Sequence, residues 1–172
     1  ENIAGTLYAR GDLAAARSSY EEALGVYRQL ASRSDVASTL TGLAEVLRYQ
    51  ADLKAARERL EEAVTLRTEA GEKGRALYAR YLLATVALEE AARGQRPCAE
   101  VAAELEQLAT GFHELGMAEA EVAALYQLAD ARLRLGWADL AANAMARAEV
   151  LAPQVTDLST RASIRITSAR VT

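Results

Sequence analysis

Apolar residues along the chain recur at helical spacing. In residues 52–70, Ala56, Leu60 and Ala63 lie at i, i+4 and i+7, which places them on one face of an α-helix. The two alanines let a neighbouring helix approach closely, and the larger leucine fills the space between the two helices. The chain shows no alternation of apolar and polar residues of the kind that strands have. The pattern therefore predicts an all-α fold.

This apolar face returns at nearly regular intervals. Residues 11–24 read GDLAAARSSYEEAL, and residues 51–64, 40 positions later, read ADLKAARERLEEAV. The face occurs four times, as Ala16, Tyr20 and Ala23; as Ala56, Leu60 and Ala63; as Val101, Leu105 and Leu108; and as Ala141, Met145 and Ala148. The third copy follows the second by 45 residues, so we assign five additional residues to 92–97. A period between about 20 and 50 residues is typical of stacked helical repeats.

Nine helices are expected from the spacing of these apolar faces and from the capping and turn residues beside them. Their ranges are 2–10, 12–32, 35–50, 52–70, 75–93, 97–114, 117–135, 138–152 and 157–170. Asp12 and Asp52 are the expected N-caps of two of them, and Pro97 suits the first turn of another. Gly42 lies inside a helix, where we expect it to allow close helix contact. The last range is more polar than the others, as a capping helix at the end of an array should be.

The repeated unit resembles the tetratricopeptide repeat. Leu43 and Ala44 match its first helix, the Ala56, Leu60 and Ala63 face matches its second, and Pro153 lies where the family often has proline. The family's tryptophan is replaced by Leu40, Arg80 and Leu125. The period near 40 resembles the longer variety found in kinesin light chains and bacterial signalling proteins. The resemblance implies a right-handed superhelical solenoid, with antiparallel pairs at 1–32, 35–70, 75–114 and 117–152 and a cap at 154–172.

The resemblance also implies a concave groove, lined by the first helix of each pair, that binds a protein or peptide partner. The groove candidates are Tyr8, Thr41, Glu45, Arg48, Tyr49, Tyr78, Tyr81, Thr85, Tyr126, Asp130 and Arg134. Tyrosine offers a large, rigid contact area with a polar tip, which suits recognition. Arg48 and Arg134 could hold a carboxylate of the partner. Alternatively, these tyrosines pack between helices and have no role in binding.

Composition narrows the classes of function. The net charge is −4 with acids and bases mixed, so no basic stripe indicates nucleic acid. The chain has no apolar run long enough for a membrane and no export signal, and its one cysteine, Cys98, fits a reducing, cytoplasmic compartment. Abundant arginine and alanine suggest a bacterial source. Since the chain starts at Glu1 inside a shortened first helix, we expect a fragment of a longer protein.

Candidate chemistry is sparse, so we expect no enzyme activity, cofactor or metal. Cys98 and His113 would lie about 22 Å apart along one helix, too far for a catalytic pair. The neighbouring acids Glu61–Glu62 and Glu89–Glu90 point in different directions, and we expect them to face solvent.

The predicted function is a protein–protein interaction or regulatory module in a larger bacterial signalling protein, such as a Ser/Thr kinase or transcription regulator. The alternatives are a small-ligand sensor, with the irregular segment Gln95–Pro97 as its candidate site, and a self-associating scaffold that forms homo-oligomers.

Overall fold

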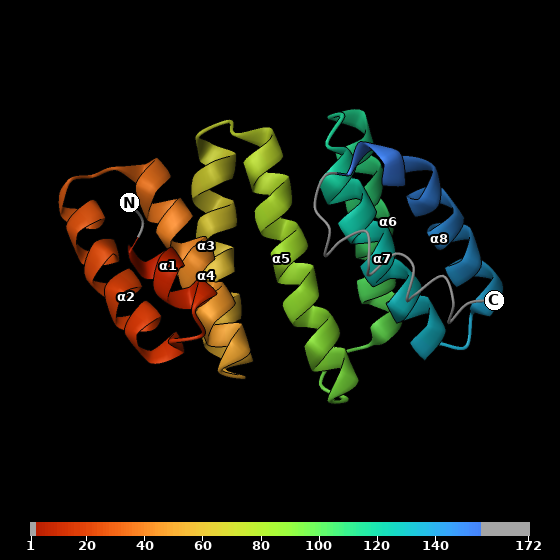
Figure 1. The fold of residues 1–172 in the computed structure, drawn as a ribbon, viewed down its shortest axis with the longest axis horizontal. Helices are drawn as coiled ribbons and strands as arrows, with labels where there is room; N and C mark the ends of the chain where they lie inside the picture. Colours follow the sequence, from red (N-terminus) through yellow and green to blue (C-terminus); the bar gives the residue numbers. More distant parts are fainter. Residues whose placement is uncertain (1–2, 156–172) are drawn as a thin grey trace. The chain divides into compact units, whose positions relative to one another are not determined.

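A computed structural model describes residues 3–155, which are helical throughout apart from short turns (Figure 1). The elements are α1 (Ile3–Ala9), α2 (Leu13–Gln29), α3 (Arg33–Tyr49), α4 (Leu53–Glu69), α5 (Lys73–Ala92), α6 (Cys98–Glu114), α7 (Ala118–Arg134), α8 (Ala138–Leu151) and the 3-10 helix η1 (Ala152–Gln154). The predicted all-α class is confirmed for these residues. The expected helix at 157–170 lies outside the described residues, and its capping role stays a prediction.

A regular step of 20 residues produces the 40-residue period. Helices α2, α3, α4, α6 and α7 each contain 17 residues, and a three-residue turn follows each of them. Helix α5 has 20 residues, and five residues separate it from α6. The five additional residues that the sequence assigned to 92–97 are therefore shared between a longer α5 and a longer turn. Periodicity alone could not divide them, because a helix can lengthen without changing its apolar pattern.

Each turn ends one helix and starts the next. In the turn after α3, Ala51 has a left-handed backbone with φ 64°, and the N–H of Asp52 donates to the carbonyl of Leu47 at 3.0 Å. The Asp52 carboxylate then accepts from the N–H of Ala55 at 3.2 Å. Asp12 caps α2 in the same way. Both predicted N-caps are thus confirmed.

The chain divides into two compact units, Glu1–Val86 and Ala87–Thr172, and we describe each by itself. In the first unit α1 packs on α2, α2 on α3, and α3 on α4. In the second unit α6 packs on α7, α7 on α8, and η1 contacts both α7 and α8. Packing between consecutive helices is the arrangement that a stacked repeat requires.

The repeated apolar face forms the core of both units. In α4, Ala56, Leu60 and Ala63 are at most 2% exposed, and the corresponding residues of α6 and α8 are buried as well. The first copy departs from the prediction, because Ala23 is only half-buried and its neighbour Leu24 takes the buried place. The buried face of α2 is therefore rotated slightly toward its next residue near the C-terminal end.

Gly42 leaves space for the aromatic ring of Tyr20, the middle residue of the first apolar face. The other three faces have leucine or methionine at this position. A Cβ atom at Gly42 would lie 2.6 Å from Cζ and 2.7 Å from Oη of Tyr20. These distances leave no room for any side chain while Tyr20 keeps its position. The expected close helix contact at Gly42 is confirmed, and its partner is the Tyr20 ring of α2.

Polar groups join the helices differently in the two units. In the first unit the buried guanidinium of Arg67 donates to Ser34 Oγ at 3.0 Å and Ser38 Oγ at 2.6 Å, and it forms an ion pair with Glu72. In the second unit Glu106 of α6 accepts from Arg132 of α7 and Arg147 of α8, both at 2.5 Å. The first network thus joins α3 to α4, and the second joins α6 to α7 and α8.

Candidate peptide-binding face

Five of the groove candidates converge in the first unit, although three different helices carry them. We call this set the tyrosine cluster; it consists of Tyr8 of α1, Glu45, Arg48 and Tyr49 of α3, and Tyr78 of α5. Spacing on α3 explains part of this convergence, because Glu45 lies one helical turn before both Arg48 and Tyr49. The contributions of α1 and α5 depend on packing.

The Tyr49 ring lies between a second aromatic ring and a cation. Its centroid is 5.6 Å from that of Tyr8 in an edge-on arrangement, with 63° between the two planes. The Arg48 guanidinium lies 4.6 Å from the Tyr49 centroid, within the range of a cation–π contact. A hydrogen bond also joins the Tyr8 and Tyr49 side chains. Tyr49 nevertheless remains 58% exposed, so a partner could reach it.

Glu45 supplies a half-buried carboxylate to the tyrosine cluster. Burial raises its pKa, and the positive charge of Arg48 opposes this effect without cancelling it. Burial also raises the pKa of the Tyr8 and Tyr78 phenols, and the charge of Glu45 adds to the rise in both.

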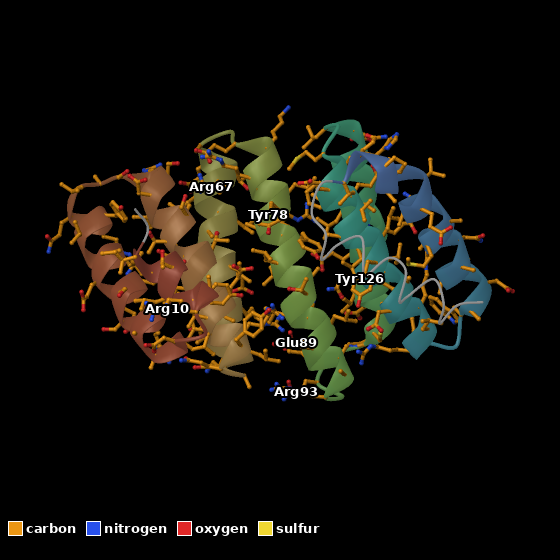
Figure 2. All side chains as sticks on the ribbon, in the orientation of Figure 1. Arg10, Arg67, Tyr78, Glu89, Arg93 and Tyr126 are labelled. Carbon is orange, nitrogen blue, oxygen red and sulfur yellow. The ribbon has the colours of Figure 1, made fainter. Side chains whose placement is uncertain are left out.

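The sequence left two roles open for the tyrosines, contact with a partner and packing between helices. Tyr78 and Tyr81 of α5 differ in which of these roles their exposure suits. Their centroids lie 6.0 Å apart on α5, with an interplanar angle of 39°. Tyr81 is buried, as a packing residue should be, whereas Tyr78 is 42% exposed (Figure 2 labels Tyr78). The packing interpretation thus suits Tyr81, and the exposed ring suits contact with a partner.

The two threonine candidates make their hydrogen bonds inside their own helices. Thr41 Oγ1 donates to the carbonyl of Ala37 at 2.9 Å, and Thr85 Oγ1 donates to the carbonyl of Leu82 at 2.7 Å. Both side chains are half-buried. Their role as groove residues stays a prediction.

The three remaining candidates belong to α7 of the second unit, where Figure 2 labels Tyr126. The Arg134 guanidinium pairs with the Asp130 carboxylate at 2.7 Å, one turn earlier on the same helix. Tyr126 is half-buried. Asp130 occupies the Nε–H of Arg134 and offsets its charge, which weakens the attraction of Arg134 for a partner carboxylate.

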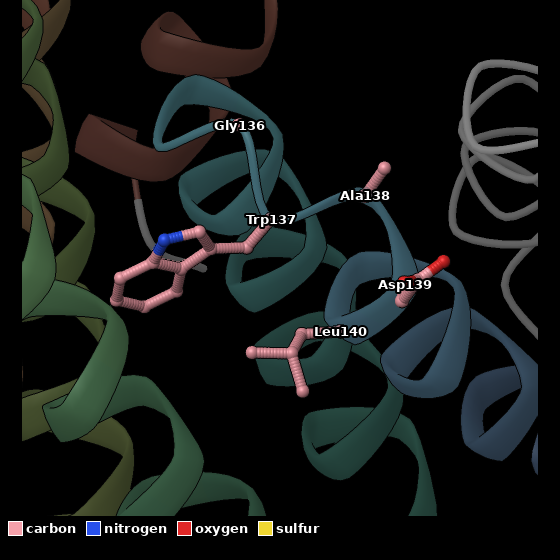
Figure 3. A pocket seen from close by; sticks show the side chains of 5 residues that line it. All are labelled: Gly136, Trp137, Ala138, Asp139 and Leu140. Atoms are coloured by element: carbon pink, nitrogen blue, oxygen red, sulfur yellow. The ribbon is translucent and has the colours of Figure 1, made fainter.

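Trp137 is a surface feature that sequence reasoning missed. It precedes α8 at the position that Asp12 and Asp52 occupy before α2 and α4, and it makes no side-chain cap bond. Trp137 and Leu140, 44% and 45% exposed, lie beside a shallow hollow of about 340 Å³ (Figure 3). The signal was present in the sequence, since a tryptophan stands where the register calls for a capping residue.

Cys98 and His113, the two side chains considered for catalysis, both contact neighbouring helices. Cys98 Sγ donates to the carbonyl of Ala131 at 3.6 Å, and burial raises the pKa of its thiol. His113 Nδ1 lies 3.0 Å from Glu121 Oε2, and this contact joins the end of α6 to the start of α7.

The expectation that Glu89 and Glu90 both face solvent is wrong for Glu90, which is buried. Helix α5 is apolar on several sides, so its faces could not be assigned from sequence.

None of the described helices is both long enough and apolar enough to cross a membrane. Among the described residues, no group of three or more His, Cys, Asp or Glu side chains could hold a metal ion.

Comparison with known proteins agrees with the helix-pair architecture. Residues 1–69 match the family model of the tetratricopeptide repeat. Among solved structures, the nearly identical TPR-like repeats of a Podosopora anserina protein assigned to the kinesin light chains match 98% of this chain at 18% identity. That structure has a TM-score of 0.73 over 82% of its own chain, and a variant of the same protein has a TM-score of 0.75 over 81%. A search of curated proteins finds no match. The resemblance to the tetratricopeptide repeat is therefore confirmed. The family model shows it for residues 1–69, and the solved structures show the same fold over 98% of the chain.

Proposed function

We propose that this chain is a protein–protein interaction module whose partner docks on the tyrosine cluster. Tetratricopeptide repeats generally bind protein partners, because their stacked helices present an extended surface and enclose no pocket. The observation that supports this site is the exposure of two of its aromatic rings, Tyr49 and Tyr78, together with the contacts that Tyr49 makes with Tyr8 and Arg48. No other part of the described chain gathers as many of the groove candidates.

The chemistry of the tyrosine cluster suits an interface. Each exposed ring offers apolar area with a hydroxyl at its edge and loses little conformational freedom when a partner covers it. The contacts among Tyr8, Tyr49 and Arg48 hold the rings in place before binding, so little further ordering is needed. Tyrosine and arginine are also the residue types that dominate binding hot spots.

Site-specific photocrosslinking tests this proposal. A benzophenone side chain would replace Tyr49 or Tyr78, and the matched control would replace Leu30, which is 69% exposed at the end of α2. We expect one partner protein to crosslink from positions 49 and 78 and to be absent from position 30, with unchanged helical circular dichroism. Equal crosslinking from all three positions would contradict the proposal. An adduct of twice the chain mass would identify self-association.

We further propose that the module belongs to a larger bacterial signalling protein of the cytoplasm, such as a Ser/Thr kinase or a transcription regulator. The support is the 40-residue period, the arginine- and alanine-rich composition and the single free cysteine. The sequence of the complete gene tests this directly. A kinase or DNA-binding domain in the same reading frame supports the proposal, and a secretion signal in that frame contradicts it.

A further inference from the structure

Part of the apolar face of α2 is open to solvent. Ala23 is half-buried, whereas the residues at this position in the other three copies, Ala63, Leu108 and Ala148, are at most 1% exposed. The next apolar residue on this side of α2, Val26, is 53% exposed. Helix α2 therefore lacks a neighbour at a place that the other copies have covered.

The first half of α3 shows what covers this place on α4. The Arg67 guanidinium of α4 is buried and donates to Ser34 and Ser38 near the start of α3. Tyr27 of α2, 40 residues before Arg67, is only half-buried. We call Ala23, Val26 and Tyr27 the open face of α2.

Helix α1 is too short to cover the open face of α2. Helices α1 and α3 are each followed by a three-residue turn, but α3 has 17 residues and α1 has 7 (Figure 1). The part of α3 that contacts Arg67 therefore has no counterpart in α1. By analogy with the pair of α3 and α4, the group that fits on the open face is a helix antiparallel to α2.

An acidic residue borders the open face of α2. Glu22 lies one turn before Val26 and accepts a hydrogen bond from Ser18 at 3.3 Å, but it forms no ion pair with the described residues. Glu62 has the same position on α4, and there Arg28 of α2 donates to it at 2.6 Å. Within the first unit this acid thus receives an arginine from another helix, and an arginine is the charge complement of Glu22.

We propose that a partner protein docks an amphipathic α-helix antiparallel to α2, with aliphatic side chains against the open face and an arginine facing Glu22. The docked helix continues the packing of α1 on α2. A second copy of this chain fits less well, because a stable interface buries about 800 Å² on each partner and the open face has only three side chains. This surface goes beyond the proposed function, because none of its residues belongs to the tyrosine cluster.

Fluorescence anisotropy with the 172-residue chain tests the inference. The probe is a fluorescein-labelled helical peptide as long as α3, with leucine along one face and arginine beside it. We expect Val26→Glu to weaken its binding at least about tenfold, because the change places a charge in the apolar contact. The matched control Val150→Glu makes the same change at a 76% exposed valine of α8 and should leave the affinity unchanged.

The charge of the partner is tested by a second pair of variants. Glu22→Gln should weaken binding of the arginine peptide about two- to fivefold, as the loss of an exposed ion pair should. Glu61→Gln removes the same charge from an exposed position on α4 and should leave the affinity unchanged. A peptide with glutamate in place of arginine should bind the parent chain more weakly than the arginine peptide does.

Four outcomes of these measurements would overturn the inference. They are no binding of the arginine peptide, an equal loss in the two valine variants, an equal loss in the two glutamate variants, and equal binding of the two peptides.

Two further measurements exclude or identify other occupants of the open face. If light scattering shows a dimer that Val26→Glu dissociates, the occupant is a second copy. If a benzophenone at position 26 crosslinks only within its own chain in the product of the complete gene, the occupant is a segment of that chain. Either result contradicts docking of a partner protein, and a monomer with an unprotected position 26 supports it.

Discussion

Glu45 of the first unit and Asp130 of the second lie at the same place in their helices, and their surroundings differ. Asp130 forms an ion pair at 2.7 Å with Arg134 on its own helix, whereas Glu45 is followed by Arg48 and Tyr49 one turn along α3. Glu45 lies among tyrosines from three helices, two of them well exposed. The comparison shows that the repeat preserves the position of an acidic residue while the groups around that residue change from one unit to the other.

The copies of the repeated apolar face also differ in their middle residue and in the residue that packs against it. The middle residue of the repeated apolar face is Tyr20 or Leu60 in the first unit and Leu105 or Met145 in the second. The residue 22 positions later is Gly42 after Tyr20, Leu82 after Leu60 and Gln127 after Leu105. The Tyr20 ring therefore coincides with the one glycine in this series, because any side chain there would occupy the space of the ring.

The largest expected effect comes from the apolar face that both units share. Leu60→Ala and Leu105→Ala should each destabilise the chain by about 2–5 kcal/mol, because both side chains are almost fully buried and their loss leaves a cavity. Urea unfolding followed by circular dichroism measures the loss. Leu30→Ala is the exposed control and should stay within about 0.5 kcal/mol of the parent chain. A neutral result for either buried leucine would show that the two units do not share one scaffold.

Gly42→Ala tests the feature that belongs to the first unit alone. In a helix without tertiary contacts this change would stabilise by about 1 kcal/mol. Here we expect a net loss of about 1–3 kcal/mol, because the new methyl group would lie 2.6 Å from Tyr20 Cζ.

A double-mutant cycle identifies the cause of that loss. In a Tyr20→Leu background, which reproduces the leucine of the second repeat, Gly42→Ala should become neutral or stabilising. If the loss persists unchanged in that background, the Tyr20 ring is not its cause.

Substituting the residues just before α4 and α8 tests how each helix is capped. The backbone of Trp137 (φ −91°, ψ 63°) is close to that of Asp52 (φ −84°, ψ 69°), so an aspartate at 137 can cap α8. Trp137→Asp should stabilise the chain by about 1 kcal/mol, and Asp52→Ala should destabilise it by about 0.5–2 kcal/mol. Thermal unfolding measures both changes. If Trp137→Asp destabilises instead, the Trp137 side chain contributes more than a cap would.

The smallest expected effect is a pH dependence located in the second unit. Burial would raise the pKa of Glu106, but the hydrogen bond from Arg147 and the charges of Arg132 and Arg147 outweigh it and lower this pKa. A carboxyl group with a lowered pKa stabilises the fold above its unfolded pKa of about 4.3, and this contribution is lost as the pH falls further.

Glu106→Gln should therefore cost up to about 1 kcal/mol at pH 7, and the difference from the parent chain should shrink between pH 5 and about pH 3. Urea unfolding across this range checks the sign, with Glu61→Gln as the exposed control. A difference that grows toward low pH would mean that the charge of Glu106 does not stabilise the second unit.

The sequence by itself determined the helical class, the 40-residue period, the two aspartate caps and nearly all of the buried face. These are local properties, because helical spacing and capping depend on residues within a few positions of one another. The alternation of helix and turn follows from the same short-range signals. Family resemblance extended the prediction to a set of candidate residues on the first helix of each pair.

Only the tertiary structure decided which of those candidates meet. Tyr8, Glu45 and Tyr78 lie on three helices, and their proximity depends on how α1, α3 and α5 are placed within the first unit. The burial of Arg67 and Glu90 and the sharing of five additional residues between α5 and its turn were likewise decided by packing. The physical reason is the range of the interactions. Helical periodicity is set along the chain, whereas the compensation of a charge depends on distances between groups that are far apart in sequence.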